Sequence, residues 1–284
     1  MSYPISSKQF DNPLLKPLLK DLTSYFSSIG MDFYIIGATA RDIIFNVIHN
    51  HNPERKTFDL DIAIAIPNWE AFDKIADDLC SIEGFAKCPK QKQRFIYNDA
   101  YELDIVPFGN VARSDSKIYW PPEESHCMNV KGFEEITQDT LSLEIDGEIT
   151  VKVASLPGIF LLKLIAWVDR GYKTNKDAED LSLIIANYLP IHQEDLPEQH
   201  YDIYDDEDYS EYTAGAVILG RDLAGMLRGR KDIGEEIVSI LQSEIKKDES
   251  SRLINGAMRY DQLLKFEQVM KAFGTILHEI QANT

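Results

Sequence analysis

Asp59 and Asp61 are the two residues whose type and spacing point most directly to chemistry. They lie in FDLDIAIAI (58–66), where polar and apolar residues alternate before the run becomes apolar throughout, a pattern that predicts a strand with one end at the surface. In a strand, side chains at i and i+2 project from the same face. Burying two carboxylates on one face without partners costs free energy of desolvation. The same two carboxylates are suitable ligands for Mg²⁺ or Mn²⁺.

A third aspartate, Asp104 in YELDIVPF, has the same apolar flanks on a later strand. If the two strands are neighbours, Asp104 completes a cluster of three carboxylates with Asp59 and Asp61. Such a cluster suits two-metal nucleotidyl transfer, in which one ion activates the attacking oxygen and the other stabilises the leaving pyrophosphate. The alternative is that D-x-D is only a strand end that meets solvent.

The segment IIGATARD (35–42) places a turn of small residues between a buried strand and a helix. Backbone N–H groups of Gly37, Ala38 and Thr39 can hold phosphate oxygens there, and the Thr39 hydroxyl adds a donor. Arg41, expected in the first helical turn, opposes the helix dipole unless it faces an anion. These four residues are therefore candidates for nucleotide binding, although a glycine between strand and helix also has a purely structural explanation.

The first half of the chain predicts a mixed α/β unit. Helical periodicity covers 14–30, ending at Gly30, and returns at 39–49 and 67–82. Strands are expected at 32–38, 58–66, 93–98 and 101–109, the last two forming a hairpin through Asp99 and Ala100. A second hairpin turns at Asp146-Gly147, a dipeptide suited to a type I′ turn. A loop is expected over 51–57, and residues 110–132 are expected to be irregular.

The second half predicts helices throughout. Five amphipathic segments cover 156–171, 176–189, 213–229, 231–247 and 261–280. The change in character near Ser155-Leu156-Pro157 predicts two domains: a catalytic core over 1–154 and a helical C-terminal domain over 155–284. The expected fold class is α+β, with a mixed, mainly antiparallel sheet in the core.

The order of these features resembles the polymerase-β-like nucleotidyltransferase superfamily, whose signature is a glycine-led turn, then D-x-D after a helix, then one more strand aspartate. The resemblance covers about residues 31–110. The sequence departs from the usual pattern by having Gly37-Ala38 at the turn and a long loop before Asp59. The resemblance implies a polymerase-β-like core with Asp59, Asp61 and Asp104 as catalytic metal ligands.

A narrower resemblance, to the AbiEii-like nucleotidyltransferase toxins of bacterial toxin–antitoxin systems, extends into the second half. It depends on Lys163 in LLKLIAWVDR and on Asp177 and Asp180 in KDAEDL. The resemblance implies that Lys163 contacts the nucleoside triphosphate and that Asp177 lies near the active site as a base for the incoming hydroxyl, with Asp180 in support. It also implies an antitoxin partner. The alternative is a surface lysine and an acidic pair that satisfies the helix dipole.

Composition narrows the class of partners. With 29 basic and 47 acidic side chains the formal charge is −18, which argues against long duplex nucleic acid as a substrate. The acidic stretch 194–211 is either a solvated loop or a docking surface for a basic protein. No apolar run approaches the ~20 residues needed to cross a membrane. We see no signal peptide, and the three scattered cysteines favour reduced thiols in a cytoplasmic protein.

The function expected from these residues is metal-dependent transfer of a nucleoside monophosphate from an NTP to an acceptor hydroxyl, with release of pyrophosphate. The acceptor of such a toxin would be RNA, for instance a tRNA end, or a protein side chain. One alternative is a nucleotidyltransferase for a small molecule such as an aminoglycoside, and the pattern from Gly37 to Asp42 is also similar to that of the CCA-adding and poly(A) polymerase group. Another alternative is a catalytically silent nucleotide sensor or scaffold.

Overall fold

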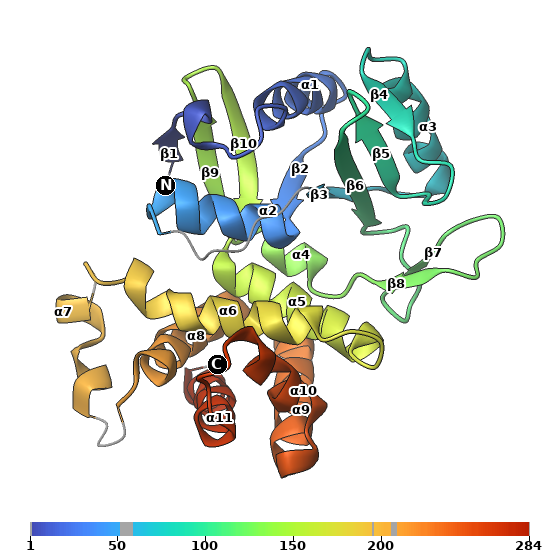
Figure 1. The fold of residues 1–284 in the computed structure, drawn as a ribbon. Helices are drawn as coiled ribbons and strands as arrows, with labels where there is room; N and C mark the ends of the chain where they lie inside the picture. The colour runs from blue at the N-terminus through green and yellow to red at the C-terminus, as the bar shows by residue number, and fades with distance from the viewer. Residues whose placement is uncertain (1, 52–58, 195, 206–208, 284) are drawn as a thin grey trace. The chain divides into compact units, whose positions relative to one another are not determined.

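The computed structural model describes residues 2–51, 59–194, 196–205 and 209–283. The chain divides into two compact units, Met1–Ser155 and Leu156–Thr284, coloured blue to green and green to red in Figure 1. The loop expected at 51–57 lies almost entirely outside the described residues.

A mixed sheet forms the centre of the first unit, and its described part holds eight strands. In spatial order these are β1 (Ser2–Ile5), β9 (Thr140–Ile145), β10 (Ile149–Ala154), β2 (Phe33–Ile36), β3 (Asp59–Ala65), β6 (Tyr101–Phe108), β5 (Arg94–Tyr97) and β4 (Phe85–Lys87). Parallel pairing joins β1 to β9, β10 to β2 and β3 to β6, and the other neighbours are antiparallel. The predicted mixed sheet is confirmed, with antiparallel pairs slightly in excess.

Both predicted hairpins are present. β5 and β6 pair from Tyr97 opposite Tyr101 outward, and β9 and β10 meet at Asp146 and Gly147, which both have positive φ. The region 110–132 is less irregular than expected, since β7 (Lys117–Tyr119) and β8 (Cys127–Asn129) form a small separate antiparallel sheet. Strands of three residues show too little alternation to be recognised in the sequence.

Helices accompany the sheet of the first unit. They are η1 (Ser7–Gln9), α1 (Leu15–Ser28), α2 (Gly37–Asp42), η2 (Ile43–Ile48), α3 (Trp69–Cys80) and α4 (Phe133–Ile136). The buried residues of α1 recur at helical spacing from Leu15 to Phe26, as an amphipathic helix requires. α3 begins where the Asn68 side chain accepts a hydrogen bond from the backbone N–H of Ala71, a standard N-cap.

The described part of the second unit is helical, as expected. Its elements are α5 (Leu156–Arg170), α6 (Lys176–Ile191), α7 (Leu196–Gln199), η3 (Tyr201–Asp205), α8 (Glu211–Leu227), α9 (Lys231–Lys246), η4 (Asp248–Ser250), α10 (Arg252–Ala257), η5 (Met258–Tyr260) and α11 (Phe266–Asn283). α6 packs against α5 and α8, and α8 packs against α11. Within the described ranges, no helix combines the length and apolar character that a membrane crossing requires.

Candidate active site

Four carboxylates lie in register on the two adjacent parallel strands β3 and β6. Asp61 is the direct partner of Asp104, and Asp59 is the direct partner of Glu102. Directly opposed residues of neighbouring strands project to the same side of a sheet, and so do residues two apart along a strand. The two strands are therefore neighbours, as a cluster of Asp59, Asp61 and Asp104 requires. The patch also contains Glu102, an acid outside the predicted set of three aspartates.

The alternation along both strands explains why these acids can be tolerated. Leu60 and Ile62 on β3 and Leu103 and Ile105 on β6 are 0% exposed, so the opposite face of each strand is in the core. Asp59, Asp61, Glu102 and Asp104 are only partly buried. Partial hydration lowers the cost of placing like charges together, and a patch of four carboxylates attracts cations.

Arg94 extends this patch across a third strand. It is the direct partner of Asp104 in the antiparallel β5–β6 pair, and its Nε and Nη2 atoms donate to Asp104 Oδ1 and Oδ2 over 2.7 and 2.8 Å. Its Nη1 atom also donates to Glu102. These bonds, chiefly the one to Asp104, raise the pKa of the Arg94 guanidinium above its usual value.

The donor set fits a divalent metal in chemistry and in register, because Mg²⁺ and Mn²⁺ take carboxylate oxygens. The side chains do not form a ready cage, however. Among the described residues, no three acidic, histidine or cysteine side chains are grouped closely enough to hold a metal ion. The carboxylates are in register but not grouped around a common point, and Asp104 is a main reason. Both of its oxygens bind Arg94 on the side away from Asp61.

Gly37 lies directly against the carboxylate of Asp61. Its φ of +69° belongs to the left-handed region, and a Cβ built on it would lie 2.3 Å from Asp61 Oδ2. This position therefore requires glycine twice, for its backbone conformation and for the close approach of the carboxylate. The pairing of Ile36 with Asp61 across β2 and β3 explains why the two meet.

Replacing Gly37 by alanine is expected to displace the Asp61 carboxylate and to destabilise the first unit by about 1–2 kcal/mol from the left-handed backbone alone. Nucleotidyl transfer should fall by at least about tenfold, because an error of about 1 Å in a catalytic group is sufficient for that. Gly30 is a matched control. It also has positive φ, +66°, but has open space where a Cβ would lie. Gly30→Ala should reproduce the strain and retain the activity; equal activity losses in the two variants would contradict the positional argument.

The helix after Gly37 begins earlier than the sequence suggested. The small residues form the first turn of α2 itself, so Arg41 lies beyond that turn. Arg41 is 1% exposed, and its Nε and Nη2 atoms donate to Asp42 over 2.8 and 2.6 Å. The Thr39 hydroxyl donates to the backbone carbonyl of Asp59. Thr39 thus holds the start of α2 to the start of β3, and its proton is not available to a phosphate in this arrangement.

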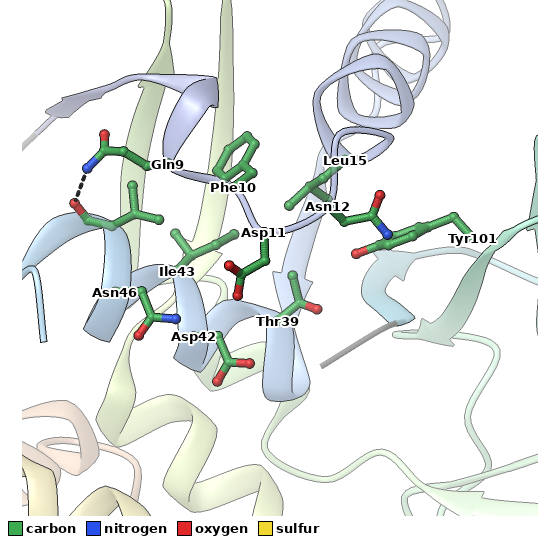
Figure 2. Close-up of a pocket in the computed structure, with 11 residues that line it drawn as sticks. Gln9, Phe10, Asp11, Asn12, Leu15, Thr39, Asp42, Ile43, Asn46 and Tyr101 are labelled. Carbon is green, nitrogen blue, oxygen red and sulfur yellow. Dashed lines mark hydrogen bonds between the residues drawn. The ribbon is translucent and has the colours of Figure 1, made fainter. Parts of the chain in front are cut away.

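A small pocket of mixed polar and apolar lining lies beside α2, with a cavity volume of about 50 Å³. Figure 2 shows Asp11 and Asn12 of the N-terminal segment on one side, Thr39 and Asp42 of α2 on the other, and Tyr101 at its edge. Burial raises the pKa of Tyr101 to about 12, with the charges of Asp59, Asp61 and Asp42 acting in the same direction. The phenol therefore stays neutral, and the pocket has room for a small polar group but not for a nucleotide.

The second unit contains its own group of charged residues, in which two aspartates are buried. Lys163 Nζ on α5 lies 2.6 Å from Asp180 Oδ2 and 3.5 Å from Asp177 Oδ1 on α6. Arg170, also on α5, donates from Nε and Nη2 to both oxygens of Asp177 over 2.6 and 2.7 Å. Asp177 is 0% exposed. The three residues selected from the sequence are therefore brought together, with Arg170 as a fourth member that was not selected.

Arg94 could have been found from the sequence. A hairpin that pairs Tyr97 with Tyr101 necessarily pairs Arg94 with Asp104 and places Glu102 two residues along the same strand. The signal is the hairpin register, extended outward from the turn at Asp99 and Ala100. Arg170 is seven residues after Lys163, and this spacing returns to the same helix face.

A mixed sheet with D-x-D on one strand, a third aspartate in register beside it and a glycine-led helix start is the arrangement that the sequence predicts for a nucleotidyltransferase core. The chain matches the model of the nucleotidyl transferase AbiEii toxin family of type IV toxin–antitoxin systems over residues 21–212. This match covers about two thirds of its length, so the chain belongs to that family. A comparison with curated proteins found no match.

Solved structures give distant likenesses. The Thermotoga maritima CCA-adding enzyme complexed with tRNA is 11% identical with a TM-score of 0.31, over 97% of this chain and 82% of that one. A complex of CCA-adding enzyme with CTP is 12% identical with a TM-score of 0.29, over 94% and 79%. An apo tRNA-processing enzyme is 12% identical with a TM-score of 0.26, over 96% and 76%. Likenesses this distant identify no substrate for this chain.

Proposed function

We propose that this protein transfers a nucleoside monophosphate from an NTP to an acceptor hydroxyl and releases pyrophosphate, using Mg²⁺ or Mn²⁺ held by Asp59, Asp61 and Asp104. The observation that carries the proposal is the register of β3 and β6, which sets Asp61 beside Asp104 and Asp59 beside Glu102. Family membership supplies the reaction class. The bound metal would polarise the phosphoryl oxygens and stabilise the negative charge that develops during transfer.

The residues of the chain have distinct tasks in this proposal. The carboxylate patch repels a triphosphate unless cations intervene, so its charge makes transfer dependent on a metal. Gly37 lets the Asp61 carboxylate lie against the backbone, and Thr39 fixes Asp59 through its carbonyl. Backbone N–H groups of Gly37, Ala38 and Thr39 are proposed to meet the nucleotide phosphates. Arg41, buried and bound to Asp42, supports this segment from within.

Lys163 is proposed to contact the triphosphate from the helical domain. Its side chain is 16% exposed and binds Asp180, but an ammonium has three donors, so this contact leaves capacity for a phosphate. Asp177 was expected to act as a base for the incoming hydroxyl. Because it is fully buried and bound by Arg170, we propose instead that it positions Lys163.

We propose that residues 1–154 form the catalytic domain and 155–284 a helical domain that contributes to substrate binding. The family is one of toxins, so we propose that an antitoxin controls the activity and that the protein acts in the cytoplasm, where NTPs are available. The acceptor is proposed to be an RNA end or a protein side chain. The charge of −18 disfavours extended contact with a large RNA.

A labelling assay tests the proposal and identifies the acceptor class. The purified protein is incubated with Mg²⁺ and each α-³²P NTP in turn, with total tRNA, with a cell extract, with aminoglycosides and alone. We expect one NTP to label a discrete RNA or protein band. Label on the aminoglycoside would establish the small-molecule alternative. An absence of label together with an absence of metal-dependent NTP binding would reject the enzymatic proposal in favour of a silent scaffold.

A further inference from the structure

A row of three charged residues crosses the sheet at the candidate site. Asp61 on β3 is the direct partner of Asp104 on β6, which in turn is the direct partner of Arg94 on β5. Asp104 therefore has a carboxylate on one side and a guanidinium on the other. Its orientation decides whether three carboxylates can act together or only two.

Asp104 binds the guanidinium of Arg94 in this structure. Both of its oxygens accept from Arg94, at 2.7 and 2.8 Å, in the bidentate geometry that is the strongest arrangement for this pair. The side chains of Arg94 and Asp104 are only 17% and 15% exposed, so solvent screens the pair less than it would at an open surface.

Arg94 also has a second carboxylate within reach. Its Nη1 atom donates to Glu102, whose side chain is 46% exposed. Glu102 lies two residues from Asp104 on β6, on the same face. If Arg94 lost Asp104 it would keep this partner, so releasing Asp104 need not leave a buried cation unpaired, which is the costly outcome.

We propose that Arg94 is an internal counter-ion that competes with divalent metal for Asp104, and that Glu102 receives Arg94 when Asp104 turns to the metal with Asp59 and Asp61. The inference rests on the proposed metal-binding role of this carboxylate patch. It explains why the register brings the aspartates together while the described side chains form no metal cage. Arg94 and Glu102 thereby become positioning residues of the site.

The alternative assignment is that Arg94 orients Asp104 for the metal and stays bound to it. The two assignments predict opposite effects of removing the guanidinium. If Arg94 competes with the metal, its removal should tighten metal binding, because one positive charge within a few ångströms of the metal is lost. If Arg94 orients Asp104, its removal should weaken metal binding, because Asp104 is then no longer held in place.

The experiment measures Mn²⁺ binding to the full-length protein without nucleotide, by titration with detection of free Mn²⁺ in electron paramagnetic resonance. We expect Arg94→Gln to bind Mn²⁺ about tenfold more tightly than wild type, as one removed charge near the ion would give. Arg113→Gln is the matched control, since it removes the same charge from the exposed Arg113–Glu124 pair of the same unit. Its affinity should stay within about twofold of wild type.

Double variants test whether the change in Mn²⁺ affinity arises from the contact between Arg94 and Asp104. In an Asp104→Asn background, Arg94→Gln should tighten Mn²⁺ binding clearly less than in wild type, because the contested carboxylate is gone and only the loss of a nearby positive charge remains. Glu102→Gln should weaken binding more in wild type than once Arg94 is glutamine, because only in wild type does Glu102 also receive Arg94. Arg94→Lys keeps the charge without the bidentate fork and should give an intermediate affinity; it also serves as the test variant if Arg94→Gln does not fold.

Each outcome decides the inference. Unchanged or weaker Mn²⁺ binding by Arg94→Gln and Arg94→Lys would overturn the competitor role. If wild type binds Mn²⁺ in a manner that depends on Asp61, such a result would leave the proposed function standing. No Mn²⁺ binding by any variant would remove both the metal site and the inference.

Discussion

Asp61→Asn is expected to reduce nucleotidyl transfer by about 1000-fold or more while the first unit stays folded. Asp61 is central to the carboxylate patch, since it is in register with Asp104, two residues from Asp59 and in contact with the Gly37 backbone position. Removing its charge forfeits several kcal/mol of metal-mediated stabilisation of the transition state, and each 1.36 kcal/mol is a factor of ten in rate.

Steady-state rates with the preferred NTP, alongside circular dichroism, measure this effect. Asp73→Asn is the matched control, because Asp73 is an exposed aspartate of α3 in the same unit and loses the same charge. Its rate should stay within about twofold of wild type, as expected for a screened surface charge. An Asp61→Asn protein that retained full activity would remove the central role given to this patch.

Lys163→Met is expected to lower the free energy of unfolding of the second unit by about 3 kcal/mol. Lys163 Nζ lies 2.6 Å from Asp180, which is 3% exposed, and 3.5 Å from the fully buried Asp177. Methionine fills a similar volume but leaves two buried carboxylates without this cation. Breaking a buried pair on one side is costly because the remaining charge keeps its desolvation penalty.

Urea unfolding of the full-length protein measures this loss. Lys231→Met removes a lysine from an exposed pair with Glu235, 83% and 68% exposed, and should change stability by no more than about 0.5 kcal/mol. Asp180→Asn combined with Lys163→Met should recover part of the loss, since the uncompensated charge is then absent. Equal free energies of unfolding for Lys163→Met and Lys231→Met would show that Lys163 has no structural role. If Lys163→Met then lost only nucleotidyl transfer, the role of Lys163 would be confined to nucleotide binding.

The sequence predicted the candidate site where local periodicity determines structure. The alternation in FDLDIAIAI placed Asp59 and Asp61 on one strand face, and the Asp146-Gly147 dipeptide located a hairpin with both residues at positive φ. The five long helices of the second unit were predicted because each has enough turns for its apolar stripe to repeat. These features depend on neighbours along the chain.

Other features depend on tertiary packing, which the sequence alone left open. The parallel pairing of β3 with β6 joins strands about 40 residues apart, and only the folded sheet shows that Asp61 and Asp104 are in register. The sequence places Arg41 in the first turn of a helix and so predicts that it faces an anion; its burial and its bond to Asp42 depend on how α2 packs. The three-residue strands β4, β7 and β8 carry too few residues for a pattern.

The position of the transferred phosphorus distinguishes nucleotidyl transfer from phosphoryl transfer. Wild-type protein is incubated with Mg²⁺, the acceptor found in the labelling assay and the same NTP carrying ³²P either at the α or at the γ position. We expect α-label to enter the acceptor, γ-label to appear only in pyrophosphate, and Asp61→Asn to form both products at rates lower by about 1000-fold or more. Entry of γ-label into the acceptor would show phosphoryl transfer instead and would contradict the assignment of this carboxylate patch to nucleotidyl transfer.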